Sequence, residues 1–434
     1  MKWYQKTLFY HIYPLGLSGA PFYNENEEVV HRLNDLIPWI DHIKELGFTG
    51  LYIGPLFKSM SHGYDTSDYY LLDNRLGDND DLKNFVRICH EKNIRVIFDA
   101  VFNHTGRDFF AFQDIKTYRE TSWKLDWYKI NFHNNNEFDD GFSYSNWGGH
   151  NSLVKLNLDN PEVRNYLLDV VRFWVNEFEI DGLRLDAADV LNFEFMKELR
   201  ALANNIKQDF WLMGEVIHGE YGRWANDETL HSVTNYHLHK ALYSSHNDHN
   251  YFELAHTIKR QFDMGLNRID LYNFVDNHDV ERIINKLKNR NNFYPVHILL
   301  FTLPGIPSIY YGSEYGIEGK KQRGSDVSLR PHLILNELND NDYLNFIKKL
   351  ADIYNNEESL WDNNYQELQL ATTKYCFKRN DLIIVVNNDD NPCDFNIHID
   401  GKYIGLINGK EIESIDNNLH IELDSNTGEI YKKI

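Results

Sequence analysis

The amino-acid sequence predicts an α/β protein whose main domain is a (β/α)8 TIM barrel, followed by a small antiparallel β-sandwich domain. Eight short β-type runs alternate with amphipathic helical patterns, and eight such units are the number that closes a parallel barrel. Four of the runs lead into a carboxylate, and barrels of this kind build their active sites at the ends of their strands. Beyond residue 356 the helical periodicity gives way to short strands separated by Asn, Asp and Gly.

The expected barrel strands are rich in β-branched and aromatic residues and are bounded by turn-forming residues. They cover residues 8–14, 50–56, 95–101, 182–188, 210–216, 231–236, 271–276 and 308–312. The helical patterns between them place apolar residues three and four positions apart. They cover residues 29–47, 80–93, 160–178, 193–206 and 341–356. One helix start is clear, because Asn160 can cap it, Pro161 suits the first helical position and Glu162 follows in the first turn.

The connection after the third strand, residues 106–152, is longer than an ordinary βα loop. It is rich in Asn, Asp and Gly but also in aromatic residues, which argue against disorder. We expect an irregular insert that overhangs the C-terminal face of the barrel. The predicted organisation is therefore a barrel over residues 1–356, including this insert, and a C-terminal β-domain over residues 357–434.

The charge balance narrows the choice of partners. The chain has 65 acidic and 44 basic residues and a formal net charge of −21, so neither duplex nucleic acid nor an anionic membrane is an expected partner. A neutral substrate fits better. The three cysteines show no metal-binding spacing, the N-terminal segment does not resemble a signal peptide, and no apolar run is as long as a membrane span. We therefore expect a cytoplasmic protein.

Four carboxylates end apolar strand runs, where a charge without a role would be costly to desolvate. They are Asp99 in RVIFDAVFNH, Asp186 in GLRLDAADV, Glu215 in WLMGEVIH and Asp279 in LYNFVDNHD. Because the carboxyl ends of barrel strands meet on one face, these acids should share a site. Two carboxyl groups that act as nucleophile and proton donor are the chemistry of glycosidic bond cleavage.

The surroundings of two of these acids predict different roles. Arg184 and Asp186 are two residues apart on a strand, so their side chains point to the same side. Arg184 should therefore lower the pKa of Asp186 and keep it ionised, as a nucleophile requires. Glu215 stands among apolar residues that favour its protonated form, as a general acid requires. A structural ion pair is the alternative for either motif alone, and the four acids together argue against it.

Taken in order, these motifs resemble those of the α-amylase family of glycoside hydrolases, which process α-glucans. DAVFNH, GLRLDAADV, GEVIH and FVDNHD resemble the four central regions of that family. HGYDTSDYY resembles the loop after its second strand, LVKLNLDNPEVRNYL the segment before its fourth, and GIPSIYYGSEYG its eighth-strand region. The resemblance covers nearly the whole chain and implies the barrel fold and a mechanism that retains anomeric configuration.

By motif position, the resemblance implies that Asp186 is the nucleophile and Glu215 the acid/base, two groups that stand about 5–5.5 Å apart in a retaining enzyme. Asp279 would stabilise the transition state by binding the secondary hydroxyls of the sugar, and Tyr64 would stack on the sugar ring. The other substrate-binding residues that the resemblance implies are His104, Arg184 and His278, with Asp99 as the acid that orients Arg184.

The segments YSNWGGHNSLVKLNLDNPEVR and GEVIHGEYGRW, with a later VTNY, resemble the neopullulanase and cyclomaltodextrinase branch of the family. That branch acts on maltodextrins and small rings and usually has an extra N-terminal β-domain that helps it dimerise. Because the first strand is expected from residue 8, we do not expect dimerisation by that route, and the oligomeric state stays open. Ala187 follows the nucleophile position, where a small residue accompanies α-1,4 cleavage in the family.

Calcium-bearing members of the family use the Asn of the third-strand motif, here Asn103, together with a larger insert. Many members also carry Lys-His at the positions held here by Asp189 and Val190. Asn103 is thus the one candidate metal ligand. The short insert predicts that no cofactor is required and argues against a calcium site.

The expected function is retaining hydrolysis of α-1,4-glucosidic bonds in maltooligosaccharides and cyclomaltodextrins, so that the partner is an α-glucan oligosaccharide. A glucanotransferase or glucosyl isomerase of the same fold would use the same residues and differ in excluding water from the acceptor site. A non-catalytic carbohydrate-binding protein on this scaffold typically lacks one of the three catalytic acids, and all three are present here.

Overall fold

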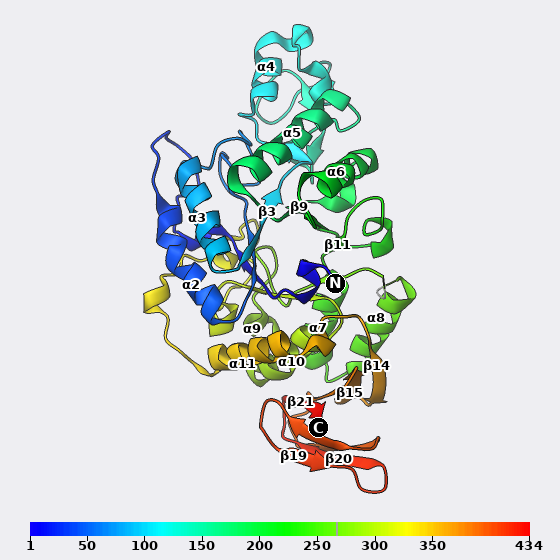
Figure 1. Cartoon of the computed structure of the whole chain (residues 1–434). Helices are drawn as coiled ribbons and strands as arrows, with labels where there is room; N and C mark the ends of the chain where they lie inside the picture. The colour runs from blue at the N-terminus through cyan, green and yellow to red at the C-terminus, as the bar shows by residue number, and fades with distance from the viewer. Residues whose placement is uncertain (266–267) are drawn as a thin grey trace.

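The computed structural model describes residues 1–265 and 268–434, and its centre is a parallel sheet that curves into a barrel (Figure 1). A parallel bridge between Thr234 and Tyr272 joins the two outer strands, so the barrel is nearly closed. The fold class predicted from the sequence is confirmed. In pairing order the strands are β11 (Ser232–Val233), β10 (Trp211–Gly214), β9 (Gly182–Leu185), β3 (Arg95–Ala100), β2 (Gly50–Ile53), β1 (Phe9–Ile12), β13 (Ile306–Tyr310) and β12 (Tyr272–Asn273).

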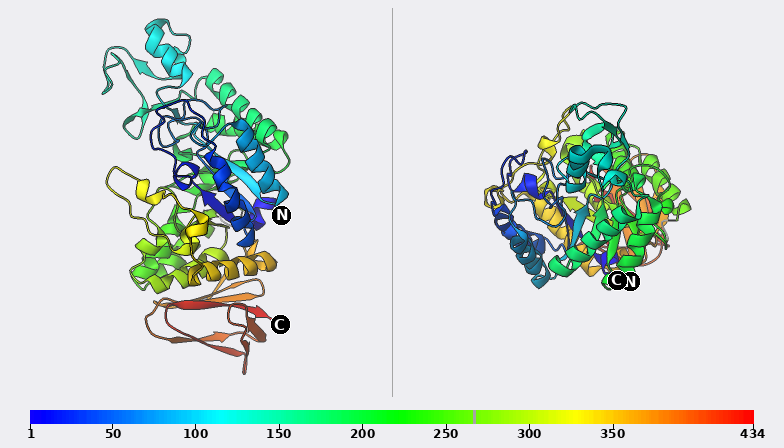
Figure 2. Two further views of the ribbon diagram at one scale, coloured as in Figure 1. Left: turned by 90° about the vertical axis from the view of Figure 1, so that its left-hand side faces the viewer. Right: turned by 90° about the horizontal axis from the view of Figure 1, so that it is seen from above.

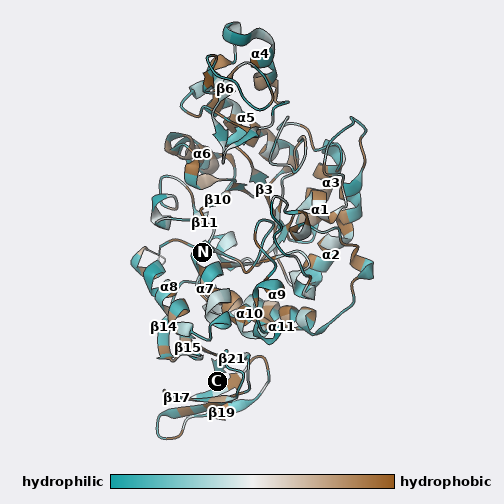
Figure 3. Ribbon diagram, turned by 180° about the vertical axis from the view of Figure 1, so that it is seen from behind, coloured by the Kyte–Doolittle hydropathy of each residue, from teal (hydrophilic) through white to brown (hydrophobic). Residues whose placement is uncertain are grey.

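Helices cover the outside of this sheet, and several mix apolar and polar segments along their length (Figure 3). Each of the five helical patterns predicted from the sequence contains a helix, and α5 begins as expected, with the Asn160 side chain accepting a hydrogen bond from the backbone of Glu162. The helices are α1 (Pro14–Leu17), α2 (Ile37–Glu45), α3 (Asn79–Glu91), α5 (Pro161–Phe178), α6 (Phe193–Ile206), α7 (Tyr236–Asn247), α8 (Tyr251–Asp263), α9 (Ile283–Lys286), α10 (Phe293–Thr302) and α11 (Asp342–Asn356).

The end of the sixth strand and one helix differ from the sequence prediction, each for a physical reason. The sixth strand was expected to run to residue 236, but the Asn235 side chain accepts from the backbone of Leu238 and caps α7 there. Helix α10 is apolar along nearly its whole length, because it lies between the barrel and the C-terminal domain and is buried on all sides. A helix without a polar face lacks the periodic spacing of apolar residues from which a helix is predicted.

Aromatic rings fill the inside of the barrel below the strand ends. The ring of Trp211 on β10 lies 5.0 Å from that of Phe9 and 5.3 Å from that of Tyr4, all three of them buried. This packing makes a solid floor, so any substrate must bind above it, at the carboxyl ends of the strands.

The insert was predicted to be irregular, and this is wrong, because it contains a helix and short strands. They are α4 (Phe110–Tyr118), β5 (Ile130–Asn131), β6 (Ser143–Tyr144), β7 (Asn146–Trp147) and the start of β8 (His150–Lys155), which pairs with β4 (His104–Thr105) just before the insert. Several of its aromatic side chains are buried, and Phe112, Phe142 and Tyr144 pack on one another and join the main apolar core, whereas Trp123 is 91% exposed. The insert stands at the opposite end of the molecule from the C-terminal strands (Figures 1 and 2).

The C-terminal domain consists of antiparallel strands in a six-stranded and a two-stranded sheet, which share an apolar core. It packs directly on the barrel, where the buried Arg379 donates hydrogen bonds to the carbonyl oxygens of Thr302 and Leu360. The strands are β14 (Gln366–Leu370), β15 (Lys374–Arg379), β16 (Leu382–Asn387), β17 (Cys393–His398), β18 (Lys402–Gly405), β19 (Glu411–Glu413), β20 (Asn418–Leu423) and β21 (Thr427–Lys433).

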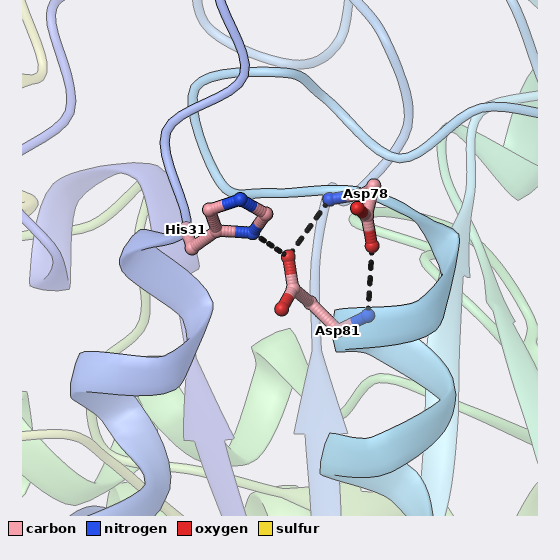
Figure 4. Close-up of side chains that lie close together, drawn as sticks. All are labelled: His31, Asp78 and Asp81. Atoms are coloured by element: carbon pink, nitrogen blue, oxygen red, sulfur yellow. Dashed lines mark hydrogen bonds and ion pairs between the residues drawn. The ribbon is translucent and has the colours of Figure 1, made fainter.

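His31, Asp78 and Asp81 meet at the start of α3 (Figure 4). Asp78 accepts from the backbone of Asp81, Asp81 accepts from the backbone of Asp78, and the His31 ring bonds to Asp81. Within residues 1–265 and 268–434 this is the one group of three His, Cys, Asp or Glu side chains with ligand atoms within 4.8 Å of one another. A helix capping box accounts for it. In the same ranges, no helix has both the length and the apolar composition to cross a membrane.

Candidate active site

The strand ends bring the predicted acids together at one end of the barrel. Asp99 lies in β3 directly opposite Arg184 in β9, and Asp186 and Glu215 each stand one residue beyond their strand. All four side chains are buried. The approach is close, since a Cβ atom on Gly54, where β2 ends, would lie only 2.4 Å from that of Asp99. The strand pairing therefore sets the positions of the charged groups.

Arg184 is the centre of this group. Its Nη1 atom lies 2.8 Å from Oδ1 of Asp99 and 2.9 Å from Oδ1 of Asp186, and its Nη2 atom lies 2.8 Å from Oε2 of Glu215. One planar guanidinium thus holds three carboxylates from three neighbouring strands. The role predicted for Asp99, to orient Arg184, agrees with this contact.

One positive charge does not neutralise three buried carboxylates. Burial raises the pKa of Asp186 well above its usual range; Arg184 opposes this shift, while Glu215 and Asp99 add to it. The predicted lowering of this pKa is therefore wrong, because the sequence indicates only the nearest cation. A group of acids this crowded readily retains a proton, and its members titrate together.

The residue that follows Asp186 has an unusual backbone conformation. Ala187 lies in the left-handed region, with φ +47° and ψ 42°, which is uncommon for a residue other than glycine. Its N–H donates to Oε2 of Glu215 at 3.1 Å. The turn after Asp186 therefore supplies a backbone donor to the neighbouring acid, and strain of this kind is typical of functional sites.

Asp279 stands in a different electrostatic setting. Its Oδ2 atom lies 3.0 Å from Nε2 of His278, and its Oδ1 atom accepts from Nη2 of Arg330 at 2.9 Å. Although burial opposes it, His278 and Arg330 hold the pKa of Asp279 well below its usual range. This carboxylate stays ionised, as a group that stabilises positive charge must.

Tyr64 joins the two sides of the site. Its hydroxyl donates to Oδ2 of Asp99 at 2.9 Å, and its ring lies 5.5 Å from that of His278 with an angle of 10° between the planes. The predicted stacking partner of the sugar is thus present and locked in orientation.

His104 is buried on the insert side of the site. Burial lowers its pKa to about 3, so the imidazole is neutral. Within the described residues its Nε2 atom has no partner, and its ring lies 5.7 Å from that of Trp147, which is 38% exposed. An unpaired buried nitrogen next to a half-exposed ring suits hydrogen bonding to a sugar hydroxyl.

Three site residues were missed in the sequence. Arg330 comes from the loop after β13, Asn277 from the loop after β12, and Tyr236 is the first residue of α7. The Tyr236 hydroxyl donates to Oε1 of Glu215 at 3.2 Å. Asn277 adjoins the predicted His278 and Tyr236 ends the VTNY motif, so both could have been found from the motifs, whereas nothing local marks Arg330.

A groove of about 480 Å³ adjoins this site. It is lined by Tyr13, His62 and Arg330, and at its outer end by Phe22 and Tyr23, which are 48% and 64% exposed. Arg330 therefore belongs both to the groove and to the surroundings of Asp279.

Asn103 lines a separate pocket of about 280 Å³, and its Oδ1 atom has no partner within the described residues. Asp159 is the one carboxylate lining that pocket; it lies 3.3 Å from Nζ of Lys129 and accepts from Asn192. Lys155 lines the pocket too. Calcium takes six to eight oxygen ligands. This pocket offers the amide oxygens of Asn103 and Asn157 and one carboxylate already paired with a lysine, and its two lysines make it a poor fit for the ion.

We expect EDTA to leave both the activity and the midpoint of thermal unfolding unchanged, because this donor set is too positive for a divalent cation. Activity assays and thermal melts with EDTA, then with added Ca²⁺ or Mg²⁺, check this. A loss that Ca²⁺ restores and Mg²⁺ does not would show that the pocket binds calcium.

Comparisons with known proteins agree with this geometry. A family model described as the catalytic domain of alpha amylase matches residues 12–366. The chain is 31% identical to a cyclomaltodextrinase of Thermoanaerobacter pseudethanolicus, over 98% of this chain and 77% of that protein.

Two solved structures extend the likeness. A cyclomaltodextrinase superposes with a TM-score of 0.89 at 25% identity, over 99% of this chain and 78% of the other. A debranching enzyme of Nostoc punctiforme superposes with a TM-score of 0.85 at 26% identity, over 99% of each chain.

Proposed function

Because the chain belongs to the α-amylase family of glycoside hydrolases, we propose that it cleaves α-1,4-glucosidic bonds in maltooligosaccharides and cyclomaltodextrins with retention of anomeric configuration. The observation that carries this proposal is the placement of Asp186 and Glu215 on the two terminal nitrogens of Arg184. A nucleophile and an acid that share one guanidinium lie close together, as double displacement requires. The name of the cyclomaltodextrinase relative supports the substrate class.

In the first step, a carboxylate oxygen of Asp186 attacks C1 of the sugar and the bond from C1 to the leaving oxygen breaks. Glu215 gives its proton to that oxygen, which keeps the bonding electron pair. Positive charge develops on the sugar ring, and the ionised Asp279 stabilises it. Arg184 holds the first two groups throughout.

In the second step, the ionised Glu215 takes a proton from a water molecule whose oxygen attacks C1. The ester bond to Asp186 breaks, its carboxylate is restored and Glu215 regains its proton. Two inversions at C1 give net retention, and one water is consumed per bond.

The groove next to Arg330 fits the donor part of the glucan. Glu215 protonates the oxygen of the leaving group. The leaving part of the glucan, on the acceptor side of the cleaved bond, therefore lies next to Glu215. The groove adjoins Asp279 instead, through Arg330, and its aromatic end at Phe22 and Tyr23 offers faces on which sugar rings stack.

A product time course tests the proposed function. The substrates are maltoheptaose, β-cyclodextrin and pullulan, and products are separated by chromatography. We expect shorter maltooligosaccharides from maltoheptaose and opening of the β-cyclodextrin ring. Longer products at high substrate concentration would instead identify a glucanotransferase. No turnover of any of the three would refute the proposed substrate class, and a pure binding protein would still bind them.

A further inference from the structure

A chain of hydrogen bonds joins two of the proposed catalytic acids without passing through Arg184. The backbone N–H of Asp279 donates to Oδ1 of Asn277 at 2.8 Å. The Nδ2 of Asn277 donates to the hydroxyl oxygen of Tyr236 at 3.2 Å, and that hydroxyl donates to Oε1 of Glu215 at 3.2 Å. The loop that carries one acid is therefore linked to the carboxyl group of another.

Each bond in this chain has a fixed direction. Oδ1 of Asn277 accepts from two backbone N–H groups, those of Asp279 and Val280, so its amide nitrogen must face Tyr236. An N–H of that nitrogen donates to a lone pair of the Tyr236 oxygen. The hydroxyl proton of Tyr236 therefore points to Glu215. Burial, with Glu215 and Asp279 nearby, raises the pKa of Tyr236 well above its usual range, so the phenol remains a donor.

The other oxygen of Glu215 cannot carry the acidic proton. Oε2 faces Nη2 of Arg184 at 2.8 Å and the N–H of Ala187 at 3.1 Å, and both of these groups only donate. A proton on Oε2 would point at another proton. The acidic proton must therefore be on Oε1, the oxygen next to Tyr236.

Tyr236 itself is firmly held. It begins α7, where Asn235 caps the helix and also bonds to Asn273 and Gln261, and its ring packs edge-on against Phe274 with the centroids 4.9 Å apart. The hydroxyl is thus a fixed reference point for the carboxyl group, a condition for precise proton delivery.

We propose that Tyr236, oriented by Asn277, is a positioning residue that aims Oε1 of Glu215 at the leaving oxygen and stabilises the carboxylate formed when the proton departs. The inference rests on the acid/base role proposed above for Glu215. As the bond from C1 to the leaving oxygen breaks, its electron pair stays on that oxygen and the proton moves there from Oε1. The Tyr236 bond then becomes charge-assisted and stronger.

The direct test is Tyr236→Phe, which removes only the hydroxyl, with Tyr243→Phe on the same helix as matched control. For maltoheptaose we expect kcat/KM to fall about tenfold, the effect of one hydrogen bond to a charged group, with KM little changed. For 4-nitrophenyl α-maltoside, whose leaving group needs little protonation, the fall in kcat/KM should be below about twofold. The control variant should match the wild type.

A double-mutant cycle separates positioning from a general structural effect. In the Glu215→Gln background, Tyr236→Phe should cause no further loss, because the group through which it acts has been removed. A full tenfold loss in both backgrounds would overturn the proposal. Thermal melts of each variant show whether it is folded.

The pH profile gives an independent readout. Without the hydroxyl, the Glu215 carboxylate loses a hydrogen-bond donor that favours its ionised form. The alkaline limb of kcat/KM in Tyr236→Phe should therefore move up by about one pH unit. An unmoved limb in an active variant would overturn the positioning role. A wild type that cleaves none of the substrates would overturn the proposed function and, with it, this inference.

Discussion

Asp186→Asn is expected to lower kcat/KM for maltoheptaose by roughly ten-thousandfold or more, while binding stays close to that of the wild type. The amide has the same shape as the carboxylate but cannot form the covalent ester with C1. Arg184 keeps its contacts with Asp99 and Glu215, so the site should remain assembled. Steady-state kinetics measure the first effect, and calorimetric titration with maltoheptaose measures the second.

Asp169→Asn is a suitable control for this substitution, because Asp169 is exposed on α5 and pairs only with Arg172 among the described residues. It should retain full activity. Near-normal turnover by Asp186→Asn would show that another group is the nucleophile.

Asp186→Asn should also stabilise the folded protein against unfolding at neutral pH. The pKa of Asp186 is raised in the folded state, so the folded protein binds this proton more tightly than the unfolded chain. The associated stability is complete below the unfolded pKa and is lost as the pH rises through the folded pKa. Asp186→Asn removes that loss, so its thermal midpoint should exceed that of the wild type at pH 7, and the two should converge near pH 3. A lower midpoint at pH 7 would contradict this assignment.

Glu215→Gln is expected to lower kcat/KM for maltoheptaose by roughly 10²–10⁴-fold, the usual contribution of a general acid. Glutamine can keep the hydrogen bonds from Arg184 and Ala187 through its carbonyl oxygen, so the loss reports on the proton and not on the packing. With 4-nitrophenyl α-maltoside the loss in kcat/KM should be below about tenfold, because that leaving group departs without a proton.

Comparison of the two substrates is the measurement that decides the role of Glu215. A large loss on maltoheptaose with a small one on the aryl maltoside would support the acid. Equal losses on both would mean that Glu215 orients the substrate or Arg184 instead.

The barrel and its acids could be predicted because their signals are local. A strand such as RVIFDA shows its β character in its own residues, and the carboxylate at its end is read from the same few positions. The pairing of parallel strands then fixes Asp99 opposite Arg184 without further information. Helix α5 was equally clear from its cap and its period.

The features that could not be predicted depend on contacts between segments that are distant in the sequence. Arg330 reaches Asp279 only because the loop after β13 folds back over the barrel, and no periodicity marks it. The pKa of Asp186 was predicted in the wrong direction because two of its neighbouring acids come from other strands. The helix in the insert was not predicted because the composition of that segment is typical of loops, although its residues Ala111, Phe112 and Ile115 are buried.

The most direct test of the central claim is proton NMR of the first anomer released from maltoheptaose, recorded before mutarotation. Double displacement through Asp186 predicts that the new reducing end appears as the α-anomer. Release of the β-anomer would contradict the account, because a single displacement by water leaves no role for a covalent bond to Asp186.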